Sequence, residues 1–237
     1  MHLLSIIIPV YNEEKTVYAL LEEMLGFEFG VPAEIIIIDD GSTDSTVGKI
    51  EQFLTDHNHN SKIKFIPCTP NRGKGYAVRQ GLKNSQGTLC LIQDADFEYE
   101  HDKVPELLLP IINGTEEIVY GSRYLPDSIS QNQTTLALLA NKFLTATLNI
   151  LYKSRLTDLH TCYKVFSSKV KDSLLLTLDD FGIDVEITTK ALRKGFHIKE
   201  LPIVYHARSK KGGKKITWRD GMLAFYYLIK FHRQSLD

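Results

Sequence analysis

The amino-acid sequence predicts a single α/β domain in which helices flank a mostly parallel central sheet. Apolar runs of strand length alternate with helix-length amphipathic segments over the first 96 residues, and βαβ crossovers produce this order. The strand segments are apolar at nearly every position, as strands covered by helices on both faces are. A polar cluster follows most of them, and ligands of parallel sheets bind at that edge.

Four strands are predicted in the first half. They cover residues 5–10, 33–38, 63–67 and 88–93. A helix is predicted to open at Asn12, because the apolar residues from Val17 to Met24 are spaced for one buried face. Gly41 supplies a turn before a helix that Ser42 or Thr43 can cap. A further helix is expected over residues 76–84, after the glycine-rich loop 71–75.

The second half is less regular. We expect a strand at 117–119, a helix at 135–152, and a strand within 196–205 that Pro202 interrupts. A basic loop at 206–219 contains Gly212 and Gly213 and precedes an apolar helix at 222–231. Because no repeat or linker is visible, residues 1–237 are predicted to form one domain. Its nucleotide-binding half would be 1–96 and its acceptor-binding half 97–237.

Composition excludes several classes of protein. The three cysteines are far apart and form no CxxC pair, which argues against a disulfide framework or a zinc site and favours a reducing compartment. We expect no signal peptide, and no window approaches the roughly 20 apolar residues of a membrane-spanning helix. The expected location is the cytoplasm, with peripheral attachment to the cytoplasmic face of a membrane left open.

Charge is distributed unevenly along the chain. Residues 187–237 carry a net charge of +9 and the remainder carries −10, so we expect a metal site in the acidic part and anion contact in the basic part. A nucleic-acid surface is disfavoured, because the basic loop lacks interleaved aromatic residues and the whole chain is not basic.

Asp94 and Asp96 close the fourth apolar strand, and Glu98 follows them. Carboxylates of this kind suit Mg²⁺ or Mn²⁺ shared with a diphosphate. The alternative is a set of solvated acids at a strand end, and it is the better interpretation of the motif alone. The polar clusters at the neighbouring strand ends favour the metal site.

Two other loops offer ligand contacts. Asp39 and Asp40 precede a helix start and could accept hydrogen bonds from a base or ribose, or could simply form a turn. The loop at 71–75 would let the backbone approach a ligand, with Lys74 or Arg72 near phosphate. Neither GxxxxGK[ST] nor GxGxxG is present, which argues against a P-loop kinase and a nicotinamide dehydrogenase.

Several motifs together resemble glycosyltransferase family 2. They are SIIIPVYNEE, EIIIIDDGSTDST, NRGKGYAVRQGL, DADFEYE, GSRY, DLHTCYKVF, FGIDVEITTKALRKG and YHARSKKGGKKITWRDG, in that order. The chain looks most similar to the branch of dolichyl- or polyprenyl-phosphate mannose and glucose synthases. The resemblance implies a Rossmann-like GT-A fold and a nucleotide-diphosphate-sugar donor, such as GDP-mannose or UDP-glucose.

The resemblance also implies roles for individual residues. Nucleotide-sugar contacts would come from Pro9, Tyr11, Glu13, Asp39, Asp40, Lys74, Asp94, Arg208 and Lys214. Asp94, Asp96 and Glu98 would hold the metal. Arg123 would meet the acceptor phosphate, and Asp158 and Lys164 would line the junction between sugar and acceptor. If the acceptor were a hydroxyl, Asp158 would be the general base.

The function expected from these residues is inverting, metal-dependent transfer of a hexose to a polyprenyl phosphate. Two alternatives stay open: transfer to a saccharide hydroxyl, and a non-catalytic subunit that binds nucleotide sugars. The helix at 222–231 suits the headgroup region of a bilayer or burial against the sheet or a partner, with burial slightly favoured. A membrane-anchored partner also stays open.

Overall fold

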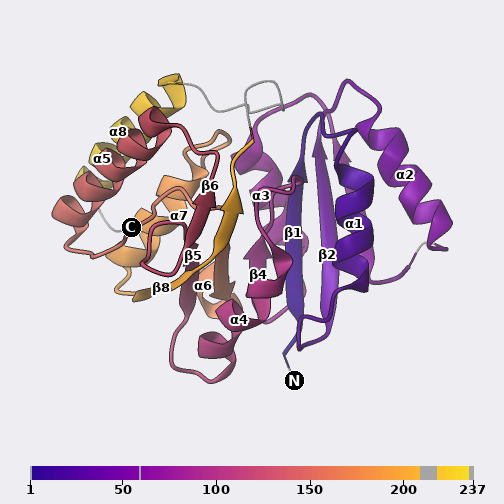
Figure 1. Cartoon of the computed structure of the whole chain (residues 1–237), viewed down its shortest axis with the longest axis horizontal. Helices are drawn as coiled ribbons and strands as arrows, with labels where there is room; N and C mark the ends of the chain where they lie inside the picture. Colours follow the sequence, from indigo (N-terminus) through magenta and orange to yellow (C-terminus); the bar gives the residue numbers. More distant parts are fainter. Residues whose placement is uncertain (1, 59, 209–217, 235–237) are drawn as a thin grey trace.

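The computed structural model describes residues 2–58, 60–208 and 218–234. Its main feature is a seven-stranded sheet with the order β3-β2-β1-β4-β7-β5-β8 (Figure 1). The strands are β1 (Leu4–Val10), β2 (Ala33–Asp40), β3 (Ile63–Cys68), β4 (Leu89–Ile92), β5 (Ile118–Ser122), β6 (Ile129–Gln131), β7 (Lys164–Ser167), β8 (Ile198–Pro202) and β9 (Val204–His206). The helices are α1 (Val17–Gly26), α2 (Thr46–Asp56), α3 (Lys74–Asn84), the short 3-10 helix η1 (His101–Lys103), α4 (Val104–Ile112), α5 (Thr135–Tyr152), α6 (Ser168–Ser173), α7 (Ile183–Arg193) and α8 (Trp218–Arg233).

The first four strands form the parallel part of the sheet. Ile7 in β1 is in register with Ile36 in β2 on one side and Ile92 in β4 on the other. All three side chains are essentially inaccessible to solvent, and burying each such side chain contributes about 2 kcal/mol. Helix α3 covers β1 and β2. The four strands predicted here are confirmed, with ends that shift by at most two residues.

Strand β7 was not predicted and lies in the middle of the sheet. It runs antiparallel to both neighbours, β4 and β5, while every other pairing within this sheet is parallel. The expectation of a mostly parallel sheet is therefore confirmed, with one reversed strand at its centre. This strand carries the end of the DLHTCYKVF motif into the core.

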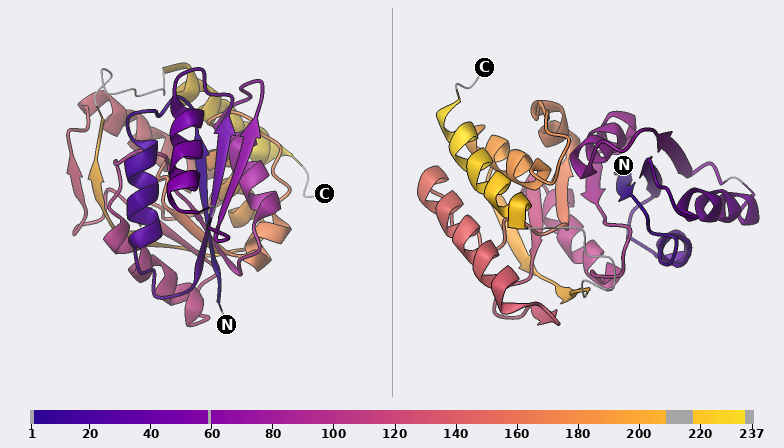
Figure 2. Two further views of the ribbon diagram at one scale, coloured as in Figure 1. Left: turned by 90° about the vertical axis from the view of Figure 1, so that its right-hand side faces the viewer. Right: turned by 90° about the horizontal axis from the view of Figure 1, so that it is seen from above.

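The second half adds a helical group beside the sheet. Helices α5, α7 and α8 pack on one another, and Figure 2 shows α5 and α8 side by side on the flank opposite α2. The bounds predicted for α5 are confirmed, and α8 is longer than predicted. The expected strand within 196–205 is divided at Ile203: β8 stays in the main sheet, while β9 pairs with β6 in a separate two-stranded sheet.

One predicted boundary is wrong. Helix α1 begins at Val17 and not at Asn12, because Asn12 has a positive φ of 49° and belongs to a turn. Its backbone N–H donates to the Ser42 hydroxyl at 2.9 Å. The turn thus joins the end of β1 to the loop after β2. In the described part of the chain, no helix combines the length and apolar character needed to cross a membrane.

Candidate active site

The polar residues after β1, β2 and β4 lie together at one edge of the sheet. The three strands are neighbours and parallel, so their carboxyl ends coincide. The Thr16 hydroxyl joins two of the clusters, because it lies 3.0 Å from Glu13 Oε2 and 2.9 Å from the carbonyl oxygen of Ala95. Pro9 lies near the end of β1 and Tyr11 directly follows the strand. The structure therefore assembles the edge that the strand order predicts.

Asp40 holds the glycine-rich loop in place. Its carboxylate accepts hydrogen bonds from the Asn71 side chain at 2.8 Å and from the backbone N–H groups of Arg72 and Gly73 at 3.0 and 2.6 Å. Burial raises the pKa of Asp40, although these two backbone donors act to lower it. The side chain of Asp40 is thus engaged in joining β2 to the loop before α3.

The two carboxylate oxygens of Asp39 differ in their hydrogen bonding. Its Oδ2 accepts from the backbone N–H groups of Gly41 and Ser42, both at 3.1 Å. Its Oδ1 is buried and has no hydrogen-bond partner in the described part of the chain. A buried carboxylate oxygen without a partner is costly, and a ligand that donates a hydrogen bond removes that cost. Asp39 is therefore the better placed of the two acids to contact a nucleobase.

Arg208 joins three acids from distant parts of the chain. Its guanidinium lies 3.0 Å from Glu13 Oε2 and 2.6 Å from Asp96 Oδ2, and its backbone N–H donates to Glu98 Oε1 at 2.7 Å. Burial raises the pKa of Asp96 to about 7, and the nearby carboxylates of Asp94 and Glu98 add to the rise while Arg208 opposes it. The carboxylates of Asp94, Asp96 and Glu98 repel one another, and a positive charge among them stabilises their ionised forms.

The same cluster supplies the donors for the predicted metal. The carboxylates of Asp94, Asp96 and Glu98 are hard oxygen ligands of the type that Mg²⁺ and Mn²⁺ accept. Asp96 and Glu98 lie beside the Arg208 guanidinium, and Asp94 lies beside Lys74. They fit such an ion by chemistry. Within the described ranges, no three acidic, histidine or cysteine side chains are close enough to enclose an ion. For these three carboxylates to hold an ion, Arg208 would have to release Asp96 and Glu98, and Lys74 would have to release Asp94.

Two of the three predicted lysines, Lys74 and Lys164, are paired with carboxylates. Lys74 Nζ lies 2.7 Å from Asp94 Oδ1, and although burial acts to lower the pKa of Lys74, Asp94 holds it well above its usual value. Lys164 is fully buried in β7, where its Nζ donates to Asp184 Oδ1 at 2.8 Å and to the Thr161 carbonyl. Lys74 lies at the edge of the acidic cluster, whereas Lys164 is held inside the sheet.

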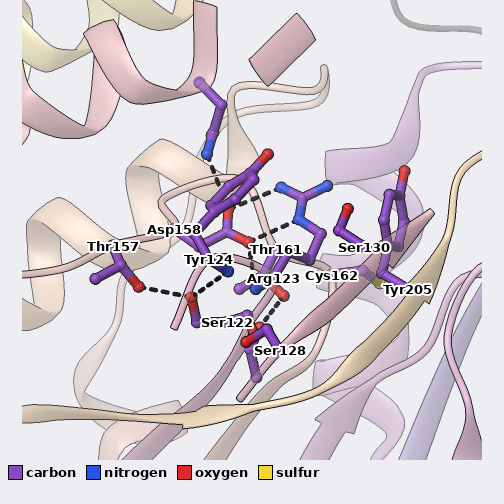
Figure 3. Close-up of polar contacts among 12 residues, drawn as sticks. Ser122, Arg123, Tyr124, Ser128, Ser130, Thr157, Asp158, Thr161, Cys162 and Tyr205 are labelled. Atoms are coloured by element: carbon purple, nitrogen blue, oxygen red, sulfur yellow. Dashed lines mark hydrogen bonds and ion pairs between the residues drawn. The ribbon is translucent and has the colours of Figure 1, made fainter. Parts of the chain in front are cut away.

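Arg123 and Asp158 form a buried ion pair with two-point geometry (Figure 3). Arg123 Nε donates to Asp158 Oδ2 at 2.6 Å and Nη2 donates to Oδ1 at 2.7 Å. The Asp158 side chain is inaccessible to solvent and that of Arg123 is nearly so. Burial acts to raise the pKa of Asp158, but the adjacent guanidinium outweighs it and holds the pKa below its usual value.

Further contacts complete the surroundings of Asp158. Asn141 Nδ2 in α5 donates to Oδ1 at 3.2 Å, and the Arg123 backbone N–H donates to Oδ2 at 3.1 Å. Glu200 in β8 accepts from the backbone N–H groups of Thr157 and Asp158 at 2.7 and 2.9 Å. With four donors on its two oxygens, Asp158 is a positioned anion and not a free base.

Aromatic rings flank the guanidinium of Arg123. Its central carbon lies 4.9 Å from the ring centre of Tyr205 and 5.5 Å from that of Tyr124. Figure 3 shows both rings beside the ion pair. Stacking of this kind fixes the plane of a guanidinium. Since Asp158 engages Nε and Nη2, Nη1 is the guanidinium nitrogen that the pair does not occupy.

Sequence reasoning assigned no role to Asn141, Asp184 or Glu200. Each lies on an element that folds back onto the strand ends from far along the chain, and each acts by holding another predicted residue. For Asn141 the available signal was a polar residue within a largely apolar helix, whereas Asp184 and Glu200 lie in segments that contain other charged residues and give no such signal. Lys214, which was predicted to contact the donor, lies outside the described residues.

Comparison with known proteins identifies the family. Residues 5–175 match the model of the family described as "Glycosyl transferase family 2". The chain belongs to this family. The matched range includes Glu13, Arg123 and Asp158. The resemblance inferred from the motifs is therefore confirmed.

Curated relatives lie in the expected branch. The chain is 30% identical over 215 residues to a dolichyl-phosphate beta-glucosyltransferase from Dictyostelium discoideum, covering 84% of this chain and 65% of that protein. It is 28% identical over 231 residues to a dolichol-phosphate mannosyltransferase from Pyrococcus furiosus, covering 97% of this chain and 62% of that protein. The chain thus spans somewhat less than two thirds of the length of these relatives.

A solved structure supports the fold. The glucosyl-3-phosphoglycerate synthase of Mycobacterium tuberculosis, crystallised with Mn²⁺, UDP-glucose and phosphoglyceric acid, superposes with a TM-score of 0.74. The superposition covers 98% of this chain and 80% of that one, at 16% identity. Identity this low establishes the fold alone. The GT-A fold expected from the motifs is confirmed.

Proposed function

We propose that this chain transfers a hexosyl group from a nucleotide-diphosphate sugar to a polyprenyl phosphate, with inversion and with the help of a divalent metal ion. The observation that carries the proposal is the buried pair of Arg123 and Asp158. It offers a fixed cation to an anionic acceptor, and it leaves Asp158 without the properties of a general base.

The choice of acceptor follows from this pair. A hydroxyl acceptor must lose a proton during attack and needs a base, preferably with a pKa near the working pH. Asp158 accepts four hydrogen bonds and has a lowered pKa, so it is poorly suited to that task. A phosphate acceptor arrives ionised, and Nη1 of Arg123 can donate to its oxygens. The curated relatives are named for dolichyl or dolichol phosphate.

The reaction is a single displacement. An oxygen of the acceptor phosphate attacks the anomeric carbon, the bond from that carbon to the diphosphate breaks, and the nucleoside diphosphate leaves with the electron pair. The leaving group gains negative charge, which Lys74 and Arg208 are placed to balance at the acidic edge. Asp39 would orient the nucleobase through its unpaired Oδ1, and Tyr11 and Glu13 follow β1, which pairs with the strand that carries Asp39.

Asp94 and Asp96, with Glu98, are the residues proposed to hold Mg²⁺ or Mn²⁺. When bound, such an ion neutralises charge on the diphosphate as a Lewis acid. With these carboxylates engaged in holding the ion, the Arg208 guanidinium would be released from them and would be free to contact the donor. A crystallised neighbour of the same fold contained Mn²⁺ and UDP-glucose, which supports the proposed class of donor.

The two halves of the chain would bind different substrates. Residues 1–96 contribute Glu13, Asp39 and Asp94 to the donor side, and residues 97–237 contribute Arg123 and Asp158 to the acceptor side. Because the acceptor is a lipid, we propose that the chain works at a membrane surface. All three cysteines are free thiols in the structure, which supports a cytoplasmic location for that surface.

Labelled substrates test this function. The chain is incubated with radiolabelled UDP-glucose or GDP-mannose, a divalent metal ion, and either polyprenyl phosphate or the matching polyprenol. Label is expected in an acid-labile lipid product only with the phosphate, since the alcohol lacks the anion and there is no base to activate it. Equal labelling of the alcohol would contradict the choice of a phosphate acceptor. Binding of donor without transfer to either lipid would contradict the proposal and favour a saccharide acceptor or a non-catalytic subunit, which a saccharide acceptor in the same assay separates.

A further inference from the structure

An exposed apolar surface runs along the outer side of α5 and α8. We call it the α5–α8 face and define it by Leu136, Leu139 and Phe143 in α5 and Trp218, Met222 and Phe225 in α8. These six side chains are between 40% and 79% exposed. The spacing of three and four residues places each set on one side of its helix. Contiguous exposed apolar side chains mark interaction surfaces.

The two helices are aligned so that their apolar sides form one surface. The rings of Phe143 and Phe225 stack with centres 5.8 Å apart. Further along, the Tyr152 hydroxyl donates to the Leu228 carbonyl at 2.9 Å. Contacts that advance along both helices together mean that α5 and α8 run parallel, and Figure 2 shows them side by side. The exposed side chains therefore gather toward the common N-terminal ends.

The charge on these helices favours an anionic partner. Helix α5 contains one charged residue, Lys142, and no acid. Helix α8 carries Arg219, Lys230 and Arg233 against a single carboxylate, Asp220. Lys142 and Arg219 lie near the exposed apolar side chains in the sequence, whereas Lys230 and Arg233 lie in the last turn of α8. Apolar side chains near basic residues, with few acids, are suited to the headgroup region of an anionic bilayer.

Helix α5 links the α5–α8 face to the acceptor side of the site. Asn141 lies on the same part of α5 as Leu139 and Phe143 but faces inward, where it donates to Asp158 Oδ1. Asp158 in turn fixes Arg123. Helix α5 therefore has one side against the residues proposed to receive the lipid phosphate and the other side exposed and apolar.

From these observations we propose that the α5–α8 face docks on an anionic phospholipid bilayer and sets Arg123 at the depth of the lipid phosphate. The proposal rests on the proposed function for its second part only. It places the lipid-facing surface on two helices of this chain and makes no use of a membrane-spanning segment.

Flotation with vesicles tests the docking. The full chain is mixed with vesicles of phosphatidylcholine alone or of phosphatidylcholine with phosphatidylglycerol, and centrifuged through a density gradient. The wild type is expected to float with the anionic vesicles and to lose binding as salt rises, because screening weakens the basic contacts. In Leu136→Glu/Leu139→Glu, the partition coefficient is expected to fall about tenfold or more, since two leucines that docking would bury in the bilayer are lost and two charges of the same sign as the lipid are added.

A matched control variant separates the loss of docking from a general effect of replacing an exposed leucine by glutamate. Leu175 is 70% exposed between α6 and α7 and lies outside the α5–α8 face, so Leu175→Glu should float like the wild type. Wild type that stays out of both vesicle fractions, or a double variant that floats as well as wild type, would overturn the proposal. So would a wild-type dimer that Leu136→Glu/Leu139→Glu splits in light scattering, because the surface would then join two copies of this chain.

Transfer measured without a bilayer separates the two proposals. With a short-chain prenyl phosphate in solution, Leu136→Glu/Leu139→Glu should match wild-type turnover, which also shows that the variant is folded. If the wild type transfers nothing to this acceptor, the proposed function fails, and the flotation result still decides the docking surface. If the double variant loses turnover here, the surface acts through folding or catalysis and the docking proposal fails.

Discussion

Asp39 and Asp40 are neighbours in the sequence and have separate tasks. Asp40 is engaged by the loop before α3, through Asn71, Arg72 and Gly73. Asp39 keeps its Oδ1 unpaired and buried. The family resemblance implied that Asp40 contacts the nucleoside and that Asp39 supports it. In the structure the Asp40 carboxylate supports a loop, whereas Asp39 keeps one oxygen that can accept a hydrogen bond from a ligand.

Asp39→Asn tests that separation. An amide can keep an oxygen toward the N–H groups of Gly41 and Ser42 while replacing the unpaired oxygen with a donor. Nucleotide affinity should therefore fall by about tenfold or more, since a hydrogen bond to a charged group contributes about 1.5–3 kcal/mol. Thermal-shift titration with UDP and GDP measures it. Asp40→Asn is the matched control, which should lower stability before ligand is added. Equal nucleotide affinity in Asp39→Asn and the wild type would contradict the assignment.

The pair of Arg123 and Asp158 makes a prediction about stability. Asp158→Asn leaves a buried guanidinium without its counter-charge, so the free energy of unfolding should fall by about 3 kcal/mol. Urea denaturation measures the change. Asp127 lies exposed in the loop that follows Arg123, and Asp127→Asn should change stability by less than about 0.5 kcal/mol. Equal stability of the two variants would show that the pair is not buried as described.

At the scale of elements, the turn after β2 depends on close backbone contact. Gly41 has a φ of +75°, and a Cβ there would lie 2.6 Å from the Asn71 backbone nitrogen. The loop that Asp40 holds therefore packs directly against this turn. A side chain at position 41 would have to move that loop, because the obstacle is backbone and cannot rotate away.

Gly41→Ala should lower the free energy of unfolding by at least about 1–2 kcal/mol, since the residue would carry both a strained φ and a clash. Gly48 in α2 is the control: a Cβ there meets nothing within 4 Å. Gly48→Ala should raise stability by about 0.5–1 kcal/mol, because alanine favours a helix interior. Chemical denaturation of both variants measures the pair. A Gly41→Ala protein as stable as wild type would contradict the described contact.

Elements with a long helical pattern or a continuous apolar run were predictable, whereas the short strand β7 was not. Helix α5 matched its predicted bounds because 18 residues of helical spacing leave little choice. Strand β7 has only four residues, and its first, Lys164, is a fully buried lysine. Its identity as a strand depends on pairing with β4 and β5, which local sequence does not contain. The start of α1 was misplaced for a similar reason, since Ser42 fixes the turn at Asn12 from another loop.

The site could be predicted as far as sheet topology brings residues together. Glu13, Asp39 and Asp94 follow neighbouring parallel strands, so their proximity follows from strand order. The pairing of Arg208 with Glu13 and Asp96 joins residues more than 100 positions apart, and the support that Asn141 gives to Asp158 depends on how α5 packs. These contacts arise from tertiary packing, which the spacing of motifs does not specify.

Across the whole molecule, buried charges on the acceptor side surround a neutral histidine. His160 lies near Asp184, Lys164, Arg123 and Asp158, and burial lowers its pKa from 6.5 to about 4. Its Nε2 is buried and lacks a hydrogen-bond partner among the described residues. As the pH falls from 6.5 to about 4, the imidazole of His160 therefore becomes protonated in the unfolded chain but stays neutral in the folded chain. Stability therefore falls as the pH drops through that window.

His160→Gln should reduce this loss of stability by about 2 kcal/mol over the same window. Urea denaturation at a series of pH values measures the slope. His197 has a side chain that is largely exposed and lies beside Glu116, so His197→Gln should keep the dependence that His160 causes. An unchanged pH slope in His160→Gln would show that this imidazole becomes protonated in the folded protein.

The most direct test of the central claim is steady-state transfer to polyprenyl phosphate by Arg123→Lys. Lysine keeps the charge but cannot hold Asp158 at two points while presenting a further N–H to phosphate. The predicted result is a fall in kcat/KM for the lipid phosphate of about a hundredfold, as expected for a lost charge-assisted contact of about 3 kcal/mol, with unchanged affinity for the nucleotide. Wild-type transfer by Arg123→Lys would contradict the account.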